Sequence, residues 1–138
     1  MALTQGMCAS FKQESWLGIH DLDTDTLNLA LYTASATLSP ATTVYTDTDE
    51  VVGTGYLTGG VTLTNVQVLL SGTTAYVTFD TPTWPIAAFT CRGALIYNAS
   101  KANRAIAVLD FGSDKVADGI FTLQLPAATA SSALLRFA

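Results

Sequence analysis

Charged residues are scarce in this sequence, and positive charges are the scarcest. Lysine and arginine number 6 and aspartate and glutamate 11 among 138 residues, so 12% of the chain is charged, against a usual share of about 25%. The cations are scattered and form no basic stripe. Binding to nucleic acid or to an anionic membrane surface requires clustered lysine and arginine. We therefore expect neither nucleic acid nor a membrane as a partner.

So little charge also limits how the surface of the protein is made. Threonine, serine and asparagine must supply much of the polar cover, and we expect some apolar surface to be covered by other chains. The length fits a single domain over residues 1–138. A chain of this size buries roughly 68–70% of its unfolded surface, which is enough to fold without a disulfide or a metal.

The usual catalytic groupings are missing. His20 is the only histidine, so sites built from two or three histidines of one chain are ruled out. The sequence has no G-x-S-x-G nucleophile motif, and its glycine pairs lack the lysine of a phosphate loop. We therefore predict that the protein is not an enzyme and uses no cofactor or metal. His20 is expected at the C-terminal end of a short helix, where the helix dipole favours a cation.

Cysteine and long apolar runs are equally rare. Cys8 and Cys91 are the only cysteines, and we expect buried free thiols, although a disulfide between them stays open. The N-terminal residues lack the basic and apolar regions of a secretory signal. No run reaches the 18 or so apolar residues of a transmembrane helix. We expect synthesis in the cytoplasm of the producing cell.

Acidic residues gather in two loops. Residues 21–25 carry three aspartates at the spacing that opens a calcium loop. Thr26 and Tyr32 stand where an EF-hand needs Gly and Glu, so an EF-hand is excluded. A looser calcium site shared with Asp47 and Asp49 stays open; the alternative is two solvated turns in which Asp caps backbone groups.

Strand-forming residues fill most of the chain. Threonine, valine and aromatic residues recur between closely spaced turn signals, a pattern typical of an all-β sandwich or barrel. The leading prediction is a jelly-roll β-sandwich of about eight strands. An immunoglobulin-like sandwich comes second, because the Cys…Trp…Cys arrangement is missing. The strands are expected at residues 27–33, 61–70, 73–80, 86–98, 104–111, 120–125 and 133–137, with a glycine-interrupted strand or bend at 51–57 and a short edge pairing at 44–46.

One short helix is predicted near the N-terminus. Ser10 offers an N-cap and Gln13 completes a capping box. The helix then covers residues 11–17 and ends at Gly18. A helix of about two turns is marginal alone and must be held by packing. The apolar side chains available for this are Phe11, Trp16 and Leu17.

Further detail is predicted for the hairpin at residues 89–115, the loop after it and the segment 61–72. Residues 89–115 read as two strands, apolar on both faces, around a polar turn at 99–103, so we expect cover on both sides from a second sheet or from a partner. Residues 112–119 read as a loop. Within 61–70 the apolar residues change parity, and a β-bulge near Thr64-Asn65 would keep them all facing the core. Ser71-Gly72 fits a tight hairpin.

Six segments together resemble a known family. They are residues 11–14 (FKQE), 29–33 (LALYT), 50–56 (EVVGTGY), 82–84 (PTW), 92–98 (RGALIYN) and 105–112 (AIAVLDFG). In combination they resemble small structural proteins of tailed phages and prophages, and within these the capsid cement (decoration) proteins of short-tailed phages. The resemblance implies a jelly-roll homodimer on the outside of an icosahedral head that bridges adjacent major capsid subunits. It implies no residue-level contacts.

The expected function is therefore structural. A cement protein in the virion has the major capsid protein and a second copy of itself as partners, and it needs no catalytic group. The candidate interface residues are Phe11, Trp16, Leu17, Trp84 and Tyr97. The helix and the arm before it are candidates for shell contact; the alternative is that the helix only caps the sandwich. The alternative is a binding module at a phage neck, tail or fibre that recognises another virion protein or, through Trp84, a host glycan.

Overall fold

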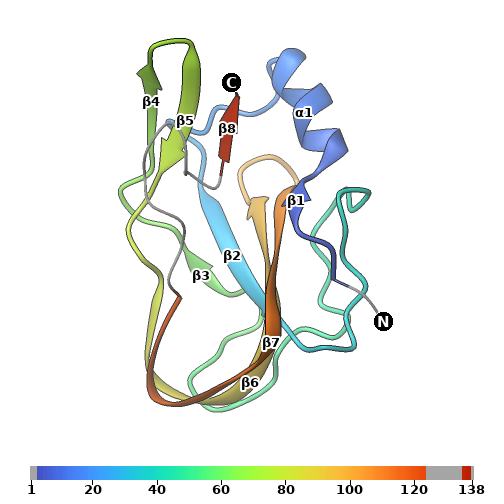
Figure 1. The fold of residues 1–138 in the computed structure, drawn as a ribbon, viewed down its shortest axis with the longest axis vertical. Coiled ribbons are helices and arrows are strands. Elements are labelled where there is room, and N and C mark those ends of the chain that lie inside the picture. The colour runs from blue at the N-terminus through green and yellow to red at the C-terminus, as the bar shows by residue number, and fades with distance from the viewer. Residues whose placement is uncertain (1–2, 124–134, 138) are drawn as a thin grey trace.

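Two antiparallel sheets and one short helix make up the fold. The structure is a computed structural model, and it describes residues 3–123 and 135–137. Half of the residues lie in strands. The large sheet has the order β1-β7-β6-β2-β3 and the small sheet the order β4-β5-β8 (Figure 1). The elements are β1 Gly6–Met7, α1 Ala9–Trp16, β2 Leu27–Tyr32, β3 Val61–Thr62, β4 Gln67–Ser71, β5 Thr74–Thr78, β6 Thr83–Asn98, β7 Arg104–Thr122 and β8 Leu135–Phe137.

The all-β prediction is confirmed, and the core lies where three strands of the large sheet meet. β2 pairs with β6 over its whole length. Four residues of β2 have no exposed surface, namely Leu29, Ala30, Leu31 and Tyr32. The half of β6 and β7 next to their shared turn is buried on both faces. The expected double cover of this hairpin is therefore present, and it comes in part from α1 and the loops of the same chain. Within the described ranges, no helix combines the length and hydropathy needed to cross a membrane.

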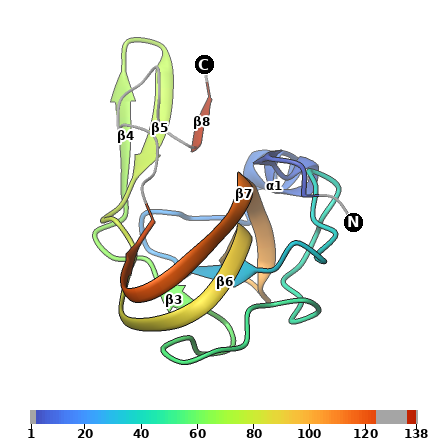
Figure 2. The ribbon, with the colours of Figure 1, turned by 60° about the horizontal axis from the view of Figure 1, so that its bottom comes forward.

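β6 and β7 form one long bent hairpin. They have 16 and 19 residues and pair from Asn98↔Arg104 at the turn to Thr83↔Thr122 at the far end. Three register shifts bend the ribbon around the molecule (Figure 2). The predicted loop at 112–119 is wrong, because β7 continues through it and keeps pairing with β6. Gly112 and Gly119 read as turn residues, yet they adopt φ of 80° and 95° inside the strand.

The remaining segments predicted as strands or turns differ in how far the structure agrees with them. Of the two possibilities for residues 51–57, strand or bend, the structure shows the bend, with one isolated bridge. Residues 61–70 do change phase at the predicted place, but the chain leaves the large sheet there and enters the small one, with Asn65 at φ 53°. Val68 and Leu70 consequently do not face the core. The hairpin at Gly72 is confirmed, and residues 124–134 of the last expected strands and linker lie outside the described residues.

The helix ends as predicted and begins differently. Its N-cap is Cys8, which makes no side-chain cap, while Ser10 lies inside the first turn. At the other end Gly18 has φ 73°, and the N–H of Ile19 donates to the Glu14 carbonyl at 3.0 Å. This is the Schellman arrangement that a C-terminal glycine permits.

Two glycines let the 50–60 loop lie directly against strand backbone. Gly55 and Gly60 have φ of 85° and 84°. A methyl group on Gly60 would lie 1.9 Å from the carbonyl oxygen of Leu29, and one on Gly55 would lie 1.6 Å from that of Ile86. The loop therefore approaches β2 and β6 only because these side chains are absent.

Gly60→Ala is expected to destabilise the protein by about 3 kcal/mol or more, because the clash with β2 backbone adds to left-handed strain. The matched control is Gly112→Ala, which has φ 80° but no atom within 4 Å of the added methyl, so that only strain of about 1–2 kcal/mol remains. Urea unfolding of both variants measures the difference. Equal losses would contradict the close approach.

Candidate functional site

The tip of α1 presents two of the five candidate residues to solvent. The Schellman turn at Gly18 ends the helix, and the side chains of Trp16 and Leu17 are 89% and 67% exposed. A tryptophan rarely stays this exposed on a protein without a partner, since large aromatic side chains supply much of the energy of cores and interfaces. The tip is therefore a candidate contact surface.

The other three candidates are buried within the chain. Phe11 packs against the ring of His20, with centroids 5.0 Å apart, and Tyr97 stacks on Tyr45 at 4.6 Å. Trp84 lies among phenylalanines on the inner face of the long hairpin. Their assignment to an exposed interface is wrong, because the helix face and the strand pairing direct all three side chains inward. Trp84, 2% exposed, cannot stack on a glycan.

The N-terminal arm is part of the large sheet rather than a free extension. Gly6 and Met7 pair with Val108 and Ala107 of β7, and the N–H of Cys8 donates to the Ile106 carbonyl at 2.8 Å. Removing the arm and α1 would uncover the core. Substitutions at the helix tip are therefore a cleaner probe of contacts than truncation.

A buried carboxylate anchors α1 to the sheet. Glu14 accepts a hydrogen bond from Arg104 Nη1 of β7 at 2.7 Å, and His20 Nε2 lies 2.8 Å from its other oxygen. The His20 side chain is buried. The expectation that this histidine follows the helix end is met, and the ring here acts as a bridge between elements.

Asn98, at the end of β6, continues the network. Its Nδ2 group lies 3.0 Å from His20 Nδ1 and donates to Asp25 at 2.7 Å, while its Oδ1 accepts from the N–H of Ser100 at 3.1 Å. This orientation makes His20 Nδ1 an acceptor and places the ring proton on Nε2, facing Glu14. Asp25 also pairs with Lys101 Nζ at 3.1 Å. The helix, the 21–25 loop and the hairpin turn are thus tied together.

Both carboxylates of this network are held in their charged form. Burial raises the pKa of Glu14, but hydrogen bonds from His20 and Arg104 outweigh it, so the pKa lies below its ordinary value. Burial likewise raises the pKa of Asp25, and bonds from Asn98, the Asp21 N–H and Lys101 bring it below the ordinary value. Of the acidic loop considered for calcium, Asp25 is thus engaged within the protein.

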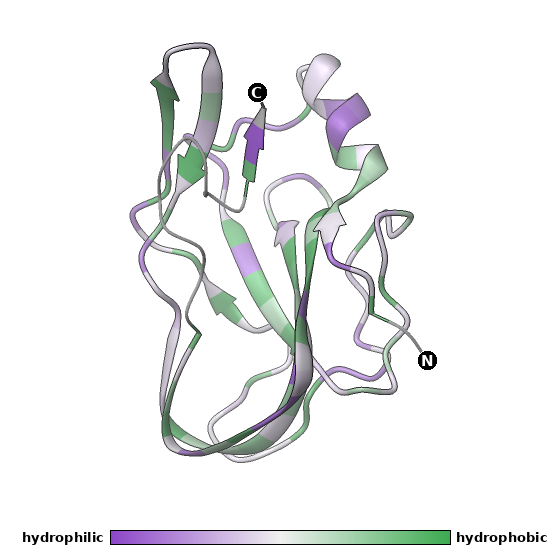
Figure 3. Cartoon of the chain, viewed as in Figure 1, coloured by the Kyte–Doolittle hydropathy of each residue, from purple (hydrophilic) through white to green (hydrophobic). Residues whose placement is uncertain are grey.

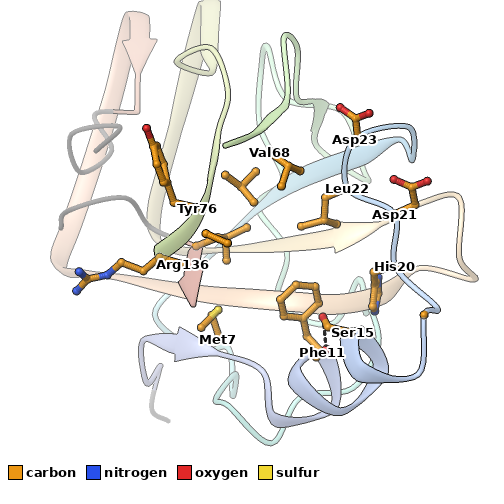
Figure 4. Close-up of a pocket in the computed structure, with 14 residues that line it drawn as sticks. Met7, Phe11, Ser15, His20, Asp21, Leu22, Asp23, Val68, Tyr76 and Arg136 are labelled. Carbon is orange, nitrogen blue, oxygen red and sulfur yellow. Dashed lines mark hydrogen bonds between the residues drawn. The ribbon is translucent and has the colours of Figure 1, made fainter. Parts of the chain in front are cut away.

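A pocket lies between α1 and the small sheet (Figure 4). Its volume is about 490 Å³. The wall is mostly apolar, with polar groups near His20 and the 21–25 loop. The lining from the helix side includes Met7, Phe11 and Leu22, and that from the small sheet includes Val68, Val77 and Leu135. The pocket is thus a largely apolar recess beside the C-terminal end of α1.

The outer face of the long hairpin adds a second apolar surface. On the half away from the turn, Phe89 and Ala117 point inward and are buried. The large apolar side chains that remain exposed there are Ile86, Val116 and Ile120. This face lies on elements different from the helix tip.

Glu50 is a structural residue that sequence reasoning missed. It is buried and accepts hydrogen bonds from Tyr45 at 2.5 Å, from Tyr56 and from the N–H of Gly59 at 2.7 Å. Burial and the bond to Glu50 raise the pKa of both tyrosines. Within an acidic loop, no sequence signal separates this carboxylate from its solvated neighbours.

The two cysteines are not paired with each other. Cys8 and Cys91 are free and buried, and burial raises the pKa of each thiol to about 11, so neither is an activated thiolate. Among residues 3–123 and 135–137, no group of three or more His, Cys, Asp or Glu side chains could hold a metal ion. Comparison with protein families, characterised proteins and solved structures gave no match.

The carboxylate network predicts a loss of stability in acid. Because the folded pKa values of Glu14 and Asp25 are lowered, their contribution is complete above the ordinary values of 4.5 and 3.8 and disappears as the pH falls through the folded values. We expect Asp25→Asn to reduce the free energy of unfolding at neutral pH and to make it depend less steeply on pH in acid. Urea unfolding as a function of pH measures both effects.

The control for this prediction is Asp23→Asn, which changes an exposed carboxylate of the same loop. It should leave the pH profile as in the parent protein. If the free energy of unfolding of Asp25→Asn depends on pH as that of the parent protein does, Asp25 does not contribute to the loss of stability in acid.

Proposed function

We propose that the protein is a capsid cement protein, which binds the outside of a phage head as a homodimer and bridges adjacent major capsid subunits. The observation that carries this proposal is the distribution of exposed apolar side chains. They gather on three elements, namely the helix tip, the outer face of the β6–β7 hairpin and β4, and three more, Val44, Val52 and Leu57, lie singly on the loop between β2 and β3. A protein that links several neighbours needs more than one contact surface.

The scaffold suits such a role. Buried hydrogen bonds of Glu14 and Asn98 fix α1 against the β6–β7 hairpin, so the helix tip and the hairpin keep their relative positions. Contacts that are individually modest can reinforce a shell when they are repeated over many copies. The low charge supports this proposal too, because apolar seams with little charge lose little to desolvation.

A jelly roll is part of the proposal. The chain passes from the large sheet at β3 to the small sheet at β4 and β5, returns for β6 and β7, and enters the small sheet again at β8. Repeated crossing between two antiparallel sheets is a feature of jelly-roll proteins. The resemblance of the six sequence segments to phage cement proteins favours the same architecture and a place in the virion.

Imaging of intact particles tests the proposal. In cryo-electron microscopy of the phage or prophage particle that carries this chain, we expect density for it over the whole outer surface of the head. Copies confined to the neck, tail or fibre would overturn the cement function and favour the alternative of a binding module there.

Trp16→Ala is expected to weaken binding to empty heads by about thirtyfold, because exposed tryptophans that become buried at interfaces are often worth about 2 kcal/mol or more. Co-sedimentation with heads that lack the protein measures this. The control is Val52→Ser, at a residue that is 93% exposed on a different loop, and it should bind normally. Undiminished decoration by Trp16→Ala would exclude the helix tip from the contact.

A further inference from the structure

β4 is an apolar strand at one edge of the small sheet. All five residues of β4 are exposed, although three of them are Val68, Leu69 and Leu70. β4 pairs with β5 on one side, and within the described residues no strand pairs with its other side. Figure 3 shows this strand in hydrophobic colours at the border of the molecule.

Proteins usually protect such edges. Charged residues, proline, β-bulges or a covering loop stop one edge strand from pairing with another. The segment from Val66 to Gly72 has no charge and no proline, and β4 pairs with β5 without a register shift. An uncharged, regular and apolar edge is suited to receive a further strand.

The hairpin turn determines which backbone groups are free. Ser71 pairs with Thr74 across the two-residue turn Gly72-Thr73, with φ 59° at Gly72. The closing pair of such a turn is hydrogen-bonded, and bonded pairs then alternate along the ladder. The N–H and C=O groups of Leu69 therefore point to β5. Those of Val68 and Leu70 point to the open edge.

We propose that β4 pairs antiparallel with β4 of a second copy, around a two-fold axis at Leu69. This names the seam of the homodimer and so rests on the proposed function. In this register Val68 lies opposite Leu70 of the second copy, and the reverse pair is equivalent. Each of the two pairs exchanges two backbone hydrogen bonds, which satisfies all the outward groups of Val68 and Leu70.

A second copy fits this edge because the edge is complementary to itself. Each chain carries a net charge of −5, yet the seam brings no charged side chain of β4 opposite another. Leu69 meets Leu69 at the axis, and apolar cross-strand pairs stabilise a sheet. The small sheet has three strands in one chain, close to the minimum for stability, and six in the dimer.

The seam also affects the pocket beside α1. Val68 lines that pocket, and cross-strand partners lie on the same face of a sheet. Leu70 of the second copy is therefore placed beside Val68 at the pocket rim. Dimerisation extends the apolar wall of the pocket and buries Leu70, which is 74% exposed in the single chain.

Cross-linking tests the register. At the two-fold axis the Leu69 pair is not hydrogen-bonded, so the two Cα atoms lie about 4.5 Å apart, within the range of about 4.4–6.8 Å for disulfides. Leu69→Cys should give a disulfide-linked dimer on mild oxidation. Leu57→Cys, at another exposed leucine, is the matched control and should stay unlinked. Equal cross-linking of the two variants would overturn the register.

A charge exchange at the same position tests the pairing without oxidation. Leu69→Lys and Leu69→Asp should each weaken self-association by about tenfold or more, because like charges then meet at the axis. A 1:1 mixture should recover the dimer, since lysine then faces aspartate. Analytical ultracentrifugation measures all three samples, and circular dichroism checks that each variant is folded.

The outcomes separate the seam from the function. Parent protein that is monomeric, or a Leu69→Lys variant that is folded and as dimeric as the parent, overturns the β4 seam. If heads are still decorated in that case, the cement function stands and only the seam is wrong. If the charged variants lose the dimer and their mixture recovers it, but the parent protein never binds heads, the seam is supported and the cement function is overturned.

Discussion

The whole structure depends on covering β6 and β7 on both faces beside their shared turn. This half of the hairpin is built almost entirely of apolar residues, and a sheet exposes two faces. β2 and β1 flank the hairpin within the sheet, while α1 and the loops between β2 and β3 cover it. Each covering element is short or irregular and has little stability alone. Other interactions must therefore hold these elements against the hairpin, and the buried polar residues supply them.

Two clusters of buried polar residues hold the covering elements in place. Glu14, His20 and Asn98 join the helix to the hairpin turn. Glu50 holds the 44–60 loop together through Tyr45 and Tyr56, and the Tyr56 hydroxyl joins that loop to the sheet by accepting a hydrogen bond from the N–H of Leu31 in β2. Every side-chain donor and acceptor of Asn98 is satisfied. Buried polar groups destabilise a protein when they lack partners and fix one arrangement when they are fully bonded. The clusters thus select a single position for each covering element.

How far the sequence predicts this fold depends on how local each signal is. The helix end at Gly18 and the turn at Gly72 were predictable because one residue decides the backbone there. The strand through Gly112 was not, because Gly112 and Gly119 resemble turn residues and only the pairing with β6 keeps them in a strand. Phe11 and Trp84 were placed at an interface because large aromatic residues serve cores and interfaces alike. Glu50 was missed because its burial is created by the loop that surrounds it.

β1 precedes every other described strand along the chain, yet its partner in the sheet is β7. The hydrogen bond from Cys8 to Ile106 spans most of the sequence and cannot form until the ribosome has passed residue 106. By contrast, β4 with β5 and β6 with β7 are local hairpins, which close early at a low entropic cost. Folding is therefore completed from the C-terminal side, and α1 docks only when the long hairpin already exists. The large sheet is thus complete only in chains that already contain β7.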